Sequence, residues 1–306
     1  MQNRLLHKNP NAIKESVGRK IFIVTNYILL TLLILICLFP FVHLLAISFS
    51  SDKYASAGLV GLWPNGFTFD AYIMLMGKKE FFRAFGISVV RTIAGTLLTL
   101  IVVVLTAYPL SKDDGRVKGR TFLSWFFVIT MFFGGGLIPT YLVISDLGLL
   151  DTIWAVILPG AFSVWNMIIA RTYYQGIPKE LREASAVDGA NEVQYFFRIL
   201  LPVCKPLIAV LVLWQFVAMW NSYFDAMIYI NTASKQPLQL VLRAILIQNQ
   251  PQSGMIADIQ STAARAQLGE LLKYATIIIS SLPLIVMYPF FQKYFDAGIM
   301  VGSVKG

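Results

Sequence analysis

The stretch that decides the fold is GIPKELREASAVDGANEVQYFFRILLPVCKP, residues 176–206, a polar segment between two long apolar ones. It carries four basic and four acidic residues and has helix signals of its own. Pro178 suits a first helical position, because its missing N–H has no partner there in any helix. Gly189 suits a helix end, and Asn191 with Gln194 has the spacing of a capping box. The stretch therefore predicts two short helices joined at a glycine and lying outside a bilayer.

The two predicted helices differ in the faces that they present. The first one has small side chains, which let another surface approach closely: Ala184, Ser185 and Ala186. The second one has apolar residues at helical spacing, which predict a single apolar stripe: Val193, Phe196, Phe197 and Leu200. Pro202 disfavours a helical conformation at Leu201, so we expect the second helix to end there. This pair of helices is therefore predicted to form a docking surface for a partner protein.

Composition places the chain in a membrane. Of 306 residues, 57% are hydrophobic and 13% are charged, and the mean hydropathy is +0.68. In soluble domains about a quarter of the residues are charged. The core of a water-soluble protein of this length could not bury so many apolar side chains. Cys37 and Cys204 lie far apart and have no metal-site spacing, which predicts free thiols. The first apolar run is too long for a cleavable signal peptide.

Six apolar segments are long enough to span a bilayer, which takes about 20 helical residues. They predict an all-α integral membrane protein with spans at Ile21–Ser51, Thr92–Leu110, Thr121–Ser145, Thr152–Ala170, Pro206–Asp225 and Tyr274–Gln292. We expect an N-terminal segment (1–20), a six-span membrane domain (21–292) that includes the 176–206 loop, and a C-terminal tail (293–306). A further amphipathic stretch is expected at Leu238–Ile247, within the polar region 231–269.

The distribution of Lys and Arg predicts the orientation. The N-terminus, the 112–120 loop, the 171–205 region and the tail together hold 16 of the 25 basic residues, whereas the loops on the opposite side hold 7. By the positive-inside rule, both termini and the 176–206 loop lie in the cytoplasm. This distribution also accounts for the net charge of +9 without a nucleic-acid partner.

Some residues within the spans admit two interpretations. Arg91 is expected to snorkel toward the membrane edge, with a place in a translocation path as the alternative. The glycine triplet around Gly135 weakens a helix; close packing against a neighbouring helix is the simpler explanation, and a water-filled path is the other. The aromatic residues of the 52–83 loop are typical either of an interfacial anchor or of a contact with a delivery protein.

The 176–206 stretch resembles the coupling motif of ABC importer membrane subunits. The pattern E-A-S-x-x-x-G-x9-I-x-L-P is carried by Glu183, Ala184, Ser185, Gly189, Ile199, Leu201 and Pro202. Asp188 and Ala190 complete a D-G-A that makes the chain similar to sugar-importer permeases, the relatives of the smaller maltose permease subunit. Ser185 stands where the family usually has a second alanine. The tail and the M-F-F-G-G-G-L-I-P-T-Y-L segment look most like the complex-oligosaccharide subgroup.

The resemblance implies a type I ABC importer permease with a two-helix coupling loop in a bacterial cytoplasmic membrane. Its partners would be a second, unlike permease subunit, two ATP-binding subunits, an extracytoplasmic solute-binding protein, the lipid bilayer and a saccharide. ATP and Mg would be bound by the ATP-binding subunits and no cofactor by this chain. The coupling residues would be those of the motif, and Gly302–Gly306 a second contact with the ATPase.

A candidate substrate path follows from the W-N-S-Y-F-D-A segment, which resembles the W-N-x-[FY] stretch of sugar-importer permeases. Aromatic faces pack on sugar rings, and amide and carboxylate groups bind hydroxyls. The candidate residues are Trp220, Asn221, Tyr223, Asp225, Arg91 and Gly135, with Trp214 and Gln215 as weaker ones. An aromatic belt at a helix end would contain the same residue types, so both interpretations stay open.

The sequence also limits the alternatives. It contains no G-x-x-x-x-G-K-[ST], so this chain is not expected to hydrolyse ATP, and no metalloprotease or serine-hydrolase motif points to an enzyme. The remaining alternatives are an importer permease for a polyol or glycerol phosphate, a stand-alone gradient-driven carrier, and a membrane scaffold. No internal repeat is evident, which disfavours the stand-alone carrier.

Overall fold

The computed structural model describes residues 16–112, 117–248 and 262–303, and in these residues the regular structure is helical. An isolated antiparallel bridge joins Ser50 and Phe67. The chain forms two compact units, residues 1–69 and 70–306. The start of the predicted N-terminal segment, residues 249–261 of the polar region and residues 304–306 of the tail lie outside the described residues. The predicted contact at Gly302–Gly306 therefore stays a prediction.

The first unit contains α1 (Val17–Ser48) and α2 (Asp52–Ser56). α1 begins where Ser16 accepts a hydrogen bond from the backbone N–H of Arg19 at 3.3 Å. Within the described part of this unit, no residue of its most apolar 18-residue stretch is buried, whereas Ala46, Ile47 and Ser48 at its end are. A helix of this kind requires lipid or a partner around it. In the following loop, three phenylalanines pack together with ring centroids 5.1–5.6 Å apart: Phe49, Phe67 and Phe69.

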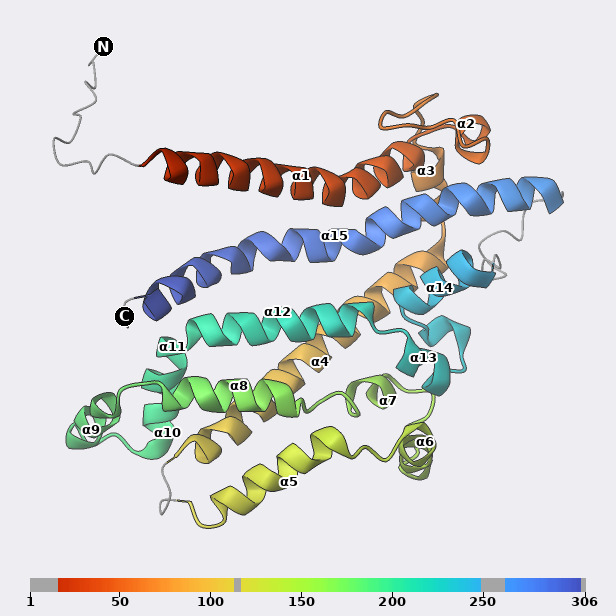
Figure 1. Cartoon of the computed structure of the whole chain (residues 1–306). Helices are drawn as coiled ribbons and strands as arrows, with labels where there is room; N and C mark the ends of the chain where they lie inside the picture. Colours follow the sequence, from red (N-terminus) through yellow and green to blue (C-terminus); the bar gives the residue numbers. More distant parts are fainter. Residues whose placement is uncertain (1–15, 113–116, 249–261, 304–306) are drawn as a thin grey trace. The chain divides into compact units, whose positions relative to one another are not determined.

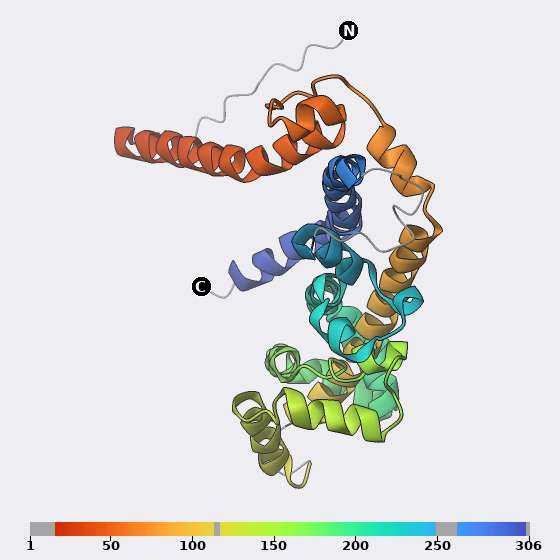
Figure 2. The ribbon, with the colours of Figure 1, turned by 90° about the vertical axis from the view of Figure 1, so that its right-hand side faces the viewer.

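The second unit is built around α4 (Lys79–Ser111), which packs closely against α8 (Val164–Gln175) and α12 (Lys205–Asn221). α12 in turn packs against α15 (Thr262–Ser303), as Figure 1 shows. The turned view of Figure 2 also places α4 alongside α12. Other helices connect or flank these four: α3 (Asp70–Met76), α5 (Arg120–Phe132), α6 (Leu137–Asp146), α7 (Ile153–Ile157), α13 (Phe224–Tyr229) and α14 (Leu238–Gln248).

The predicted third span is not one helix. α5 and α6 meet at an angle of 113°, with the glycine triplet between them. Gly136 has φ 85° and ψ 179°, a conformation that only glycine adopts readily. A Cβ atom on Gly134 or Gly136 would meet nothing within 4 Å. Within the described residues the triplet thus forms the bend between α5 and α6, and its packing against another helix stays a prediction.

The predicted fourth span is also interrupted. α7 ends at Ile157, and α8 begins only at Val164, after the Pro159–Gly160 pair. The Thr99 hydroxyl donates a hydrogen bond of 3.2 Å to the Gly160 carbonyl, which compensates for the lost helical partner. The segment predicted as the fourth span, Thr152–Ala170, is therefore two helices, since proline lacks the N–H that a continuous helix needs.

The described residues include three helices long and apolar enough to cross a membrane: α1, α4 and Leu272–Tyr294 within α15. Two bent pairs, α5 with α6 and Glu192–Val203 with α12, raise this number to five if each pair is one span. The all-helical class is confirmed, whereas six spans stay a prediction. The predicted amphipathic stretch is observed as α14, whose Leu238, Val241 and Ile245 are buried.

Candidate functional site

The joint predicted at Gly189 is present. α9 (Lys179–Val187) ends there, and Gly189 has φ 78°. The N–H of Ala190 donates to the carbonyl of Ser185 at 2.9 Å, and that of Gly189 donates to Ala186 at 3.1 Å. These two bonds form a Schellman motif, which satisfies carbonyls that a helix end leaves without partners. Pro178 immediately precedes the helix, one position before the predicted one.

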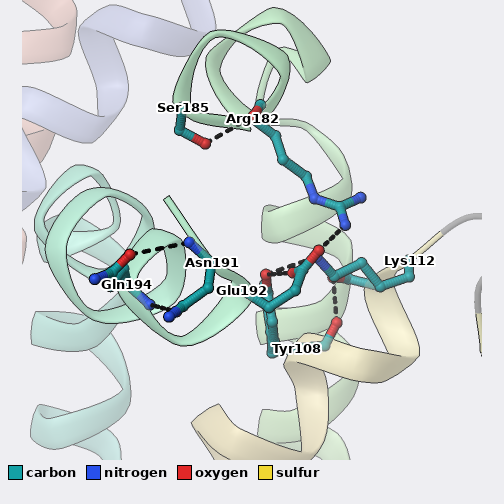
Figure 3. Close-up of polar contacts among 8 residues, drawn as sticks. Tyr108, Lys112, Arg182, Ser185, Asn191, Glu192 and Gln194 are labelled. Atoms are coloured by element: carbon teal, nitrogen blue, oxygen red, sulfur yellow. Dashed lines mark hydrogen bonds and ion pairs between the residues drawn. The ribbon is translucent and has the colours of Figure 1, made fainter. Parts of the chain in front are cut away.

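The predicted capping box is also confirmed. α10 (Glu192–Gln194) begins after Asn191, whose side chain accepts a hydrogen bond from the N–H of Gln194 at 2.8 Å. The Gln194 side chain accepts one from the N–H of Asn191 at 3.0 Å (Figure 3). The turn between the two helices is thus fixed from both sides by local hydrogen bonds.

The end of the second helix differs from the prediction. The chain continues from α10 into a π-helix (Tyr195–Leu200) and through Pro202 to the end of α11 (Leu201–Val203). The helix then bends by 78° into α12. The wider π turn has i→i+5 hydrogen bonds, and the proline lies in the first turn of α11, where its missing N–H is tolerated. The predicted helix end is therefore displaced to Val203, just after Pro202.

The π turn also divides the predicted apolar stripe. Phe196 and Leu200 are buried, whereas Val193 and Phe197 are exposed. The buried members join a core with α4, α8 and α12 that includes Val103, Met167 and Leu207. The exposed members are available at the surface of the loop together with Val187, whose side chain is 88% exposed. Sequence reasoning missed Val187, because no periodic pattern singles it out.

The motif residues separate into an exposed set and a supporting set. Glu183, Ala184, Asp188, Gly189 and Pro202 are exposed, and Ala190, Ile199 and Leu201 are half-buried. Ser185 is only 5% exposed, and its hydroxyl donates to the carbonyl of Arg182 at 2.7 Å. The prediction that Ser185 belongs to the exposed small face is wrong, because this residue lies on the inner side of α9.

A cluster of four polar residues joins this loop to the end of α4: Tyr108, Lys112, Arg182 and Glu192 (Figure 3). One carboxylate oxygen of Glu192 accepts from the Tyr108 hydroxyl at 2.6 Å and from the Lys112 ammonium at 2.7 Å. The other oxygen pairs with the guanidinium of Arg182. The Lys112 ammonium also lies 4.0 Å from the centroid of the Tyr108 ring, a cation–π contact. Sequence reasoning missed this cluster, since its members are up to 84 positions apart.

The electrostatic environment keeps Glu192 ionised. Partial burial disfavours the charged carboxylate, but the hydrogen bonds from Lys112, Tyr108 and Arg182 outweigh this and lower the pKa of Glu192 to about 2. Beside the cluster lies a cavity of 340 Å³ between the inner side of α9 and the ends of α4 and α8. Ser185, Tyr174 and Leu200 are among the residues that line it.

Two of the candidate path residues are buried within the chain. Trp220 is 1% exposed, and its indole N–H donates to the carbonyl of Ser280 at 2.9 Å. Arg91 is also 1% exposed and donates to the carbonyls of Met219 and Ser222, the latter at 2.7 Å. The snorkelling prediction for Arg91 is therefore wrong, because carbonyls at the end of α12 hold its guanidinium inside the protein.

The other candidates are more accessible. Asn221 is exposed and donates to the carbonyl of Val217 at 3.0 Å. Tyr223 is 39% exposed, with the Arg243 guanidinium 5.6 Å from its ring centroid. Asp225 accepts a hydrogen bond of 3.4 Å from the Ser222 hydroxyl. The structure thus groups Arg91 with residues 219–225, whereas Gly135 lies apart from them in the turn between α5 and α6.

Asp151 forms a second polar site that sequence reasoning missed. Its carboxylate accepts hydrogen bonds from the backbone N–H groups of Asn231 and Thr232 at 3.1 and 2.9 Å. It also accepts from the Thr232 hydroxyl and the Lys235 ammonium, both at 2.7 Å. Asp151 has φ 59°, the left-handed region that aspartate enters more readily than most residues. It joins the turn before α7 to the loop after α13.

The second unit is thus a helical bundle with an exposed two-helix loop. Comparison with known proteins shows which family has this sequence and fold. A family model described as "Binding-protein-dependent transport system inner membrane component" matches residues 84–301. The chain belongs to this family. The permease is 40% identical over 287 residues to Protein LplC of Bacillus subtilis (strain 168), covering 94% of this chain and 96% of that protein.

Two further relatives support the assignment. The permease is 37% identical to the polygalacturonan/rhamnogalacturonan transport system permease protein YtcP of Bacillus subtilis (strain 168), over 94% of this chain and 99% of that one. It is also similar to a chain of a bacterial ABC transporter involved in the import of the acidic polysaccharide alginate, with a TM-score of 0.81 and 32% identity. That match covers 92% of this permease and 99% of the solved chain. The predicted relationship to ABC importer permeases is confirmed.

Proposed function

We propose that this permease is one of two unlike membrane subunits of an ATP-driven importer for oligosaccharides or polysaccharides, and that it forms half of the translocation path. The relatives support a polymeric sugar, because one is named for the transport of polygalacturonan and rhamnogalacturonan and another for the import of alginate. The similarity extends over nearly the whole chain in both relatives, so it includes the spans as well as the coupling loop.

The single observation that carries the coupling proposal is the exposed, locally braced turn at Gly189. α9 and α10 leave Glu183, Ala184, Asp188 and Gly189 accessible, while a Schellman motif and a capping box hold the turn. A braced turn transmits a displacement instead of absorbing it. We therefore assign docking on an ATP-binding subunit to this turn, with Ser185, Ala190, Ile199, Leu201 and Pro202 supporting it. ATP and Mg would be bound by that subunit.

The remaining partners follow from the same proposal. Both termini and the coupling loop would face the cytoplasm, where the two ATP-binding subunits are. A solute-binding protein would deliver the saccharide on the opposite side, and the second permease subunit would complete the path. Asn221, Tyr223 and Asp225 are the residues that we propose for the path, since their side chains are at least partly accessible in this conformation. The buried side chains of Trp220 and Arg91 would hold the end of α12 in place beside these residues.

The proposal is tested by purifying the tagged permease from its own membrane and identifying the proteins that accompany it. We expect a second permease and an ATP-binding subunit. ATP hydrolysis by this complex should rise when its binding protein is added with the cognate member of a panel of oligosaccharides. Stimulation by a polyol or glycerol phosphate alone would overturn the sugar assignment, and uptake without any ATP-binding subunit would overturn the importer assignment.

A further inference from the structure

The attachment of α9 to the rest of the permease is sparse. Among the described helices, close packing joins α4 with α8, α4 with α12 and α12 with α15, whereas α9 packs closely against none of them. The 340 Å³ cavity separates its inner side from the ends of α4 and α8. Packed apolar side chains therefore do little to connect α9 itself with α4, and its polar contacts provide a direct connection.

The cluster around Glu192 provides this connection. The carboxylate has one oxygen on Arg182 of α9 and the other on Tyr108 and Lys112 at the end of α4. Glu192 itself is the first residue of α10. One side chain therefore connects both helices of the coupling loop with the span at the centre of the second unit, and Figure 3 shows these bonds beside the turn.

At the end of α4, Tyr108 and Lys112 are held in place by contacts of their own. The Tyr108 ring lies 4.7 Å from the ring of Phe196 and 6.5 Å from that of Tyr174, centroid to centroid. Lys112 is the residue that follows α4, and its carbonyl accepts a hydrogen bond from Arg120. Charge-assisted hydrogen bonds are about twice as strong as neutral ones. Solvent screens the 55% exposed Glu192 side chain, but its partner Lys112 is only 11% exposed, so the connection fixes the relative positions of α9, α10 and α4.

We propose that Glu192 is a positioning residue that transmits the displacement of α9 to α4 during transport. This inference rests on the proposed docking of the loop on an ATP-binding subunit, but it concerns the step after docking. The exposed face of α9 would bind the partner, and Glu192 would connect that face to the path. Without the carboxylate, α9 would move over the cavity while α4 stayed in place.

The experiment uses the complete importer, reconstituted with its partner permease, ATP-binding subunits and binding protein. Glu192→Gln keeps the size of the side chain and removes its charge. Glu180→Gln is the matched control, because Glu180 is an exposed carboxylate in the same two-helix loop, on α9. The measured quantities are recovery of the ATP-binding subunit, ATP hydrolysis, and saccharide taken up per ATP hydrolysed, together with the same values for Arg182→Gln and the Arg182→Gln/Glu192→Gln double variant.

We expect Glu192→Gln to retain the ATP-binding subunit and to hydrolyse ATP, while uptake per ATP falls by roughly fivefold or more, the lower end of measured coupling between linked sites. Glu180→Gln should match the wild type. The double variant should be no worse than the stronger single one, because both substitutions interrupt one connection.

Three results would overturn the inference: unchanged uptake per ATP in Glu192→Gln, an equal loss in Glu180→Gln, or effects of Arg182→Gln and Glu192→Gln that multiply. Loss of the ATP-binding subunit from Glu192→Gln alone would also overturn it, since Glu192 would then act in docking. Absence of that subunit from the wild-type complex would instead overturn the proposed function itself.

Discussion

The indole nitrogen of Trp220 lies 2.9 Å from the carbonyl oxygen of Ser280 and donates a hydrogen bond to it, which joins α12 to α15. Pro283 lies three residues further along α15 and cannot donate the helical hydrogen bond that its position requires. Phe216 stacks on the indole with a centroid separation of 6.2 Å, and Phe85 meets its edge at 5.8 Å. Trp220 therefore holds α12 and α15 together close to the point where Pro283 interrupts the hydrogen bonds of α15.

This contact predicts a structural effect for Trp220→Phe. The phenyl ring keeps much of the packing but leaves the Ser280 carbonyl without its partner, which costs about 0.5–1.5 kcal/mol. We expect the melting temperature of the purified complex in detergent to fall by a few degrees, with the saccharide concentration for half-maximal uptake unchanged. A higher half-maximal concentration at unchanged stability would instead favour direct contact with the sugar.

Gly189 predicts a difference between two substitutions of similar size. A Cβ atom there would meet nothing within 4 Å, so only the left-handed φ of 78° resists replacement. Valine in this conformation costs about 1–2 kcal/mol, whereas asparagine enters it readily. We expect Gly189→Val to hydrolyse ATP with reduced saccharide uptake and Gly189→Asn to be close to wild type. Equal uptake per ATP in Gly189→Val and the wild type would count against a role of the turn in coupling.

The turn between α5 and α6 gives a similar pair. Gly136 has a backbone conformation that costs other residues about 1–3 kcal/mol, while Gly134 has no such constraint. We expect Gly136→Ala to lower the melting temperature of the complex and Gly134→Ala to leave it nearly unchanged. If both substitutions had the same effect, the 113° bend would not depend on the conformation of Gly136.

Asp151 predicts a defined pH dependence. The ammonium of Lys235 and the donors of Thr232 hold the pKa of this carboxylate well below its usual range. A group with a lowered folded-state pKa contributes stability above its unfolded-state pKa of about 3.9 and loses it as pH falls toward the folded-state value. The difference in melting temperature between the wild type and Asp151→Asn should therefore be equal at pH 8 and pH 6, and should shrink only in acid below the unfolded-state pKa. A difference that changes between pH 8 and pH 6 would contradict this assignment.

The sequence was informative wherever the signal is local. The end of α4, the start of α12, the turn at Gly189 and the capping box at Asn191 each follow from residues within a few positions of one another, whereas the start of α4 lies thirteen residues before the predicted one. Interactions between distant residues were not predictable in this way. The Glu192 cluster joins α4 with α9 and α10, and Asp151 contacts a loop 80 positions away. Neither Glu192 nor Asp151 stands out in a charge pattern, since each carboxylate finds its partners only after the spans have packed.

Proline was informative only in context. Pro159 accompanies a real interruption between α7 and α8, whereas Pro202 is accommodated because a π turn precedes it. Pro159 thus lies in the interruption itself, whereas the 78° bend after Pro202 comes two residues beyond it. What decides between them is whether a nearby group, such as the Thr99 hydroxyl, or an adjusted helical turn satisfies the backbone that the proline leaves free.

Ser185 lies on the side of α9 away from the exposed turn, and its hydroxyl bonds to its own helix at Arg182. An incoming subunit would not touch this hydroxyl, so serine and alanine can replace one another here without altering the docked surface. The position is thus a natural attachment point for a small reporter group, once the exposed thiol of Cys37 has been removed. A label on a cysteine that replaces Ser185 would report any change in the cavity between α9 and the ends of α4 and α8 during turnover.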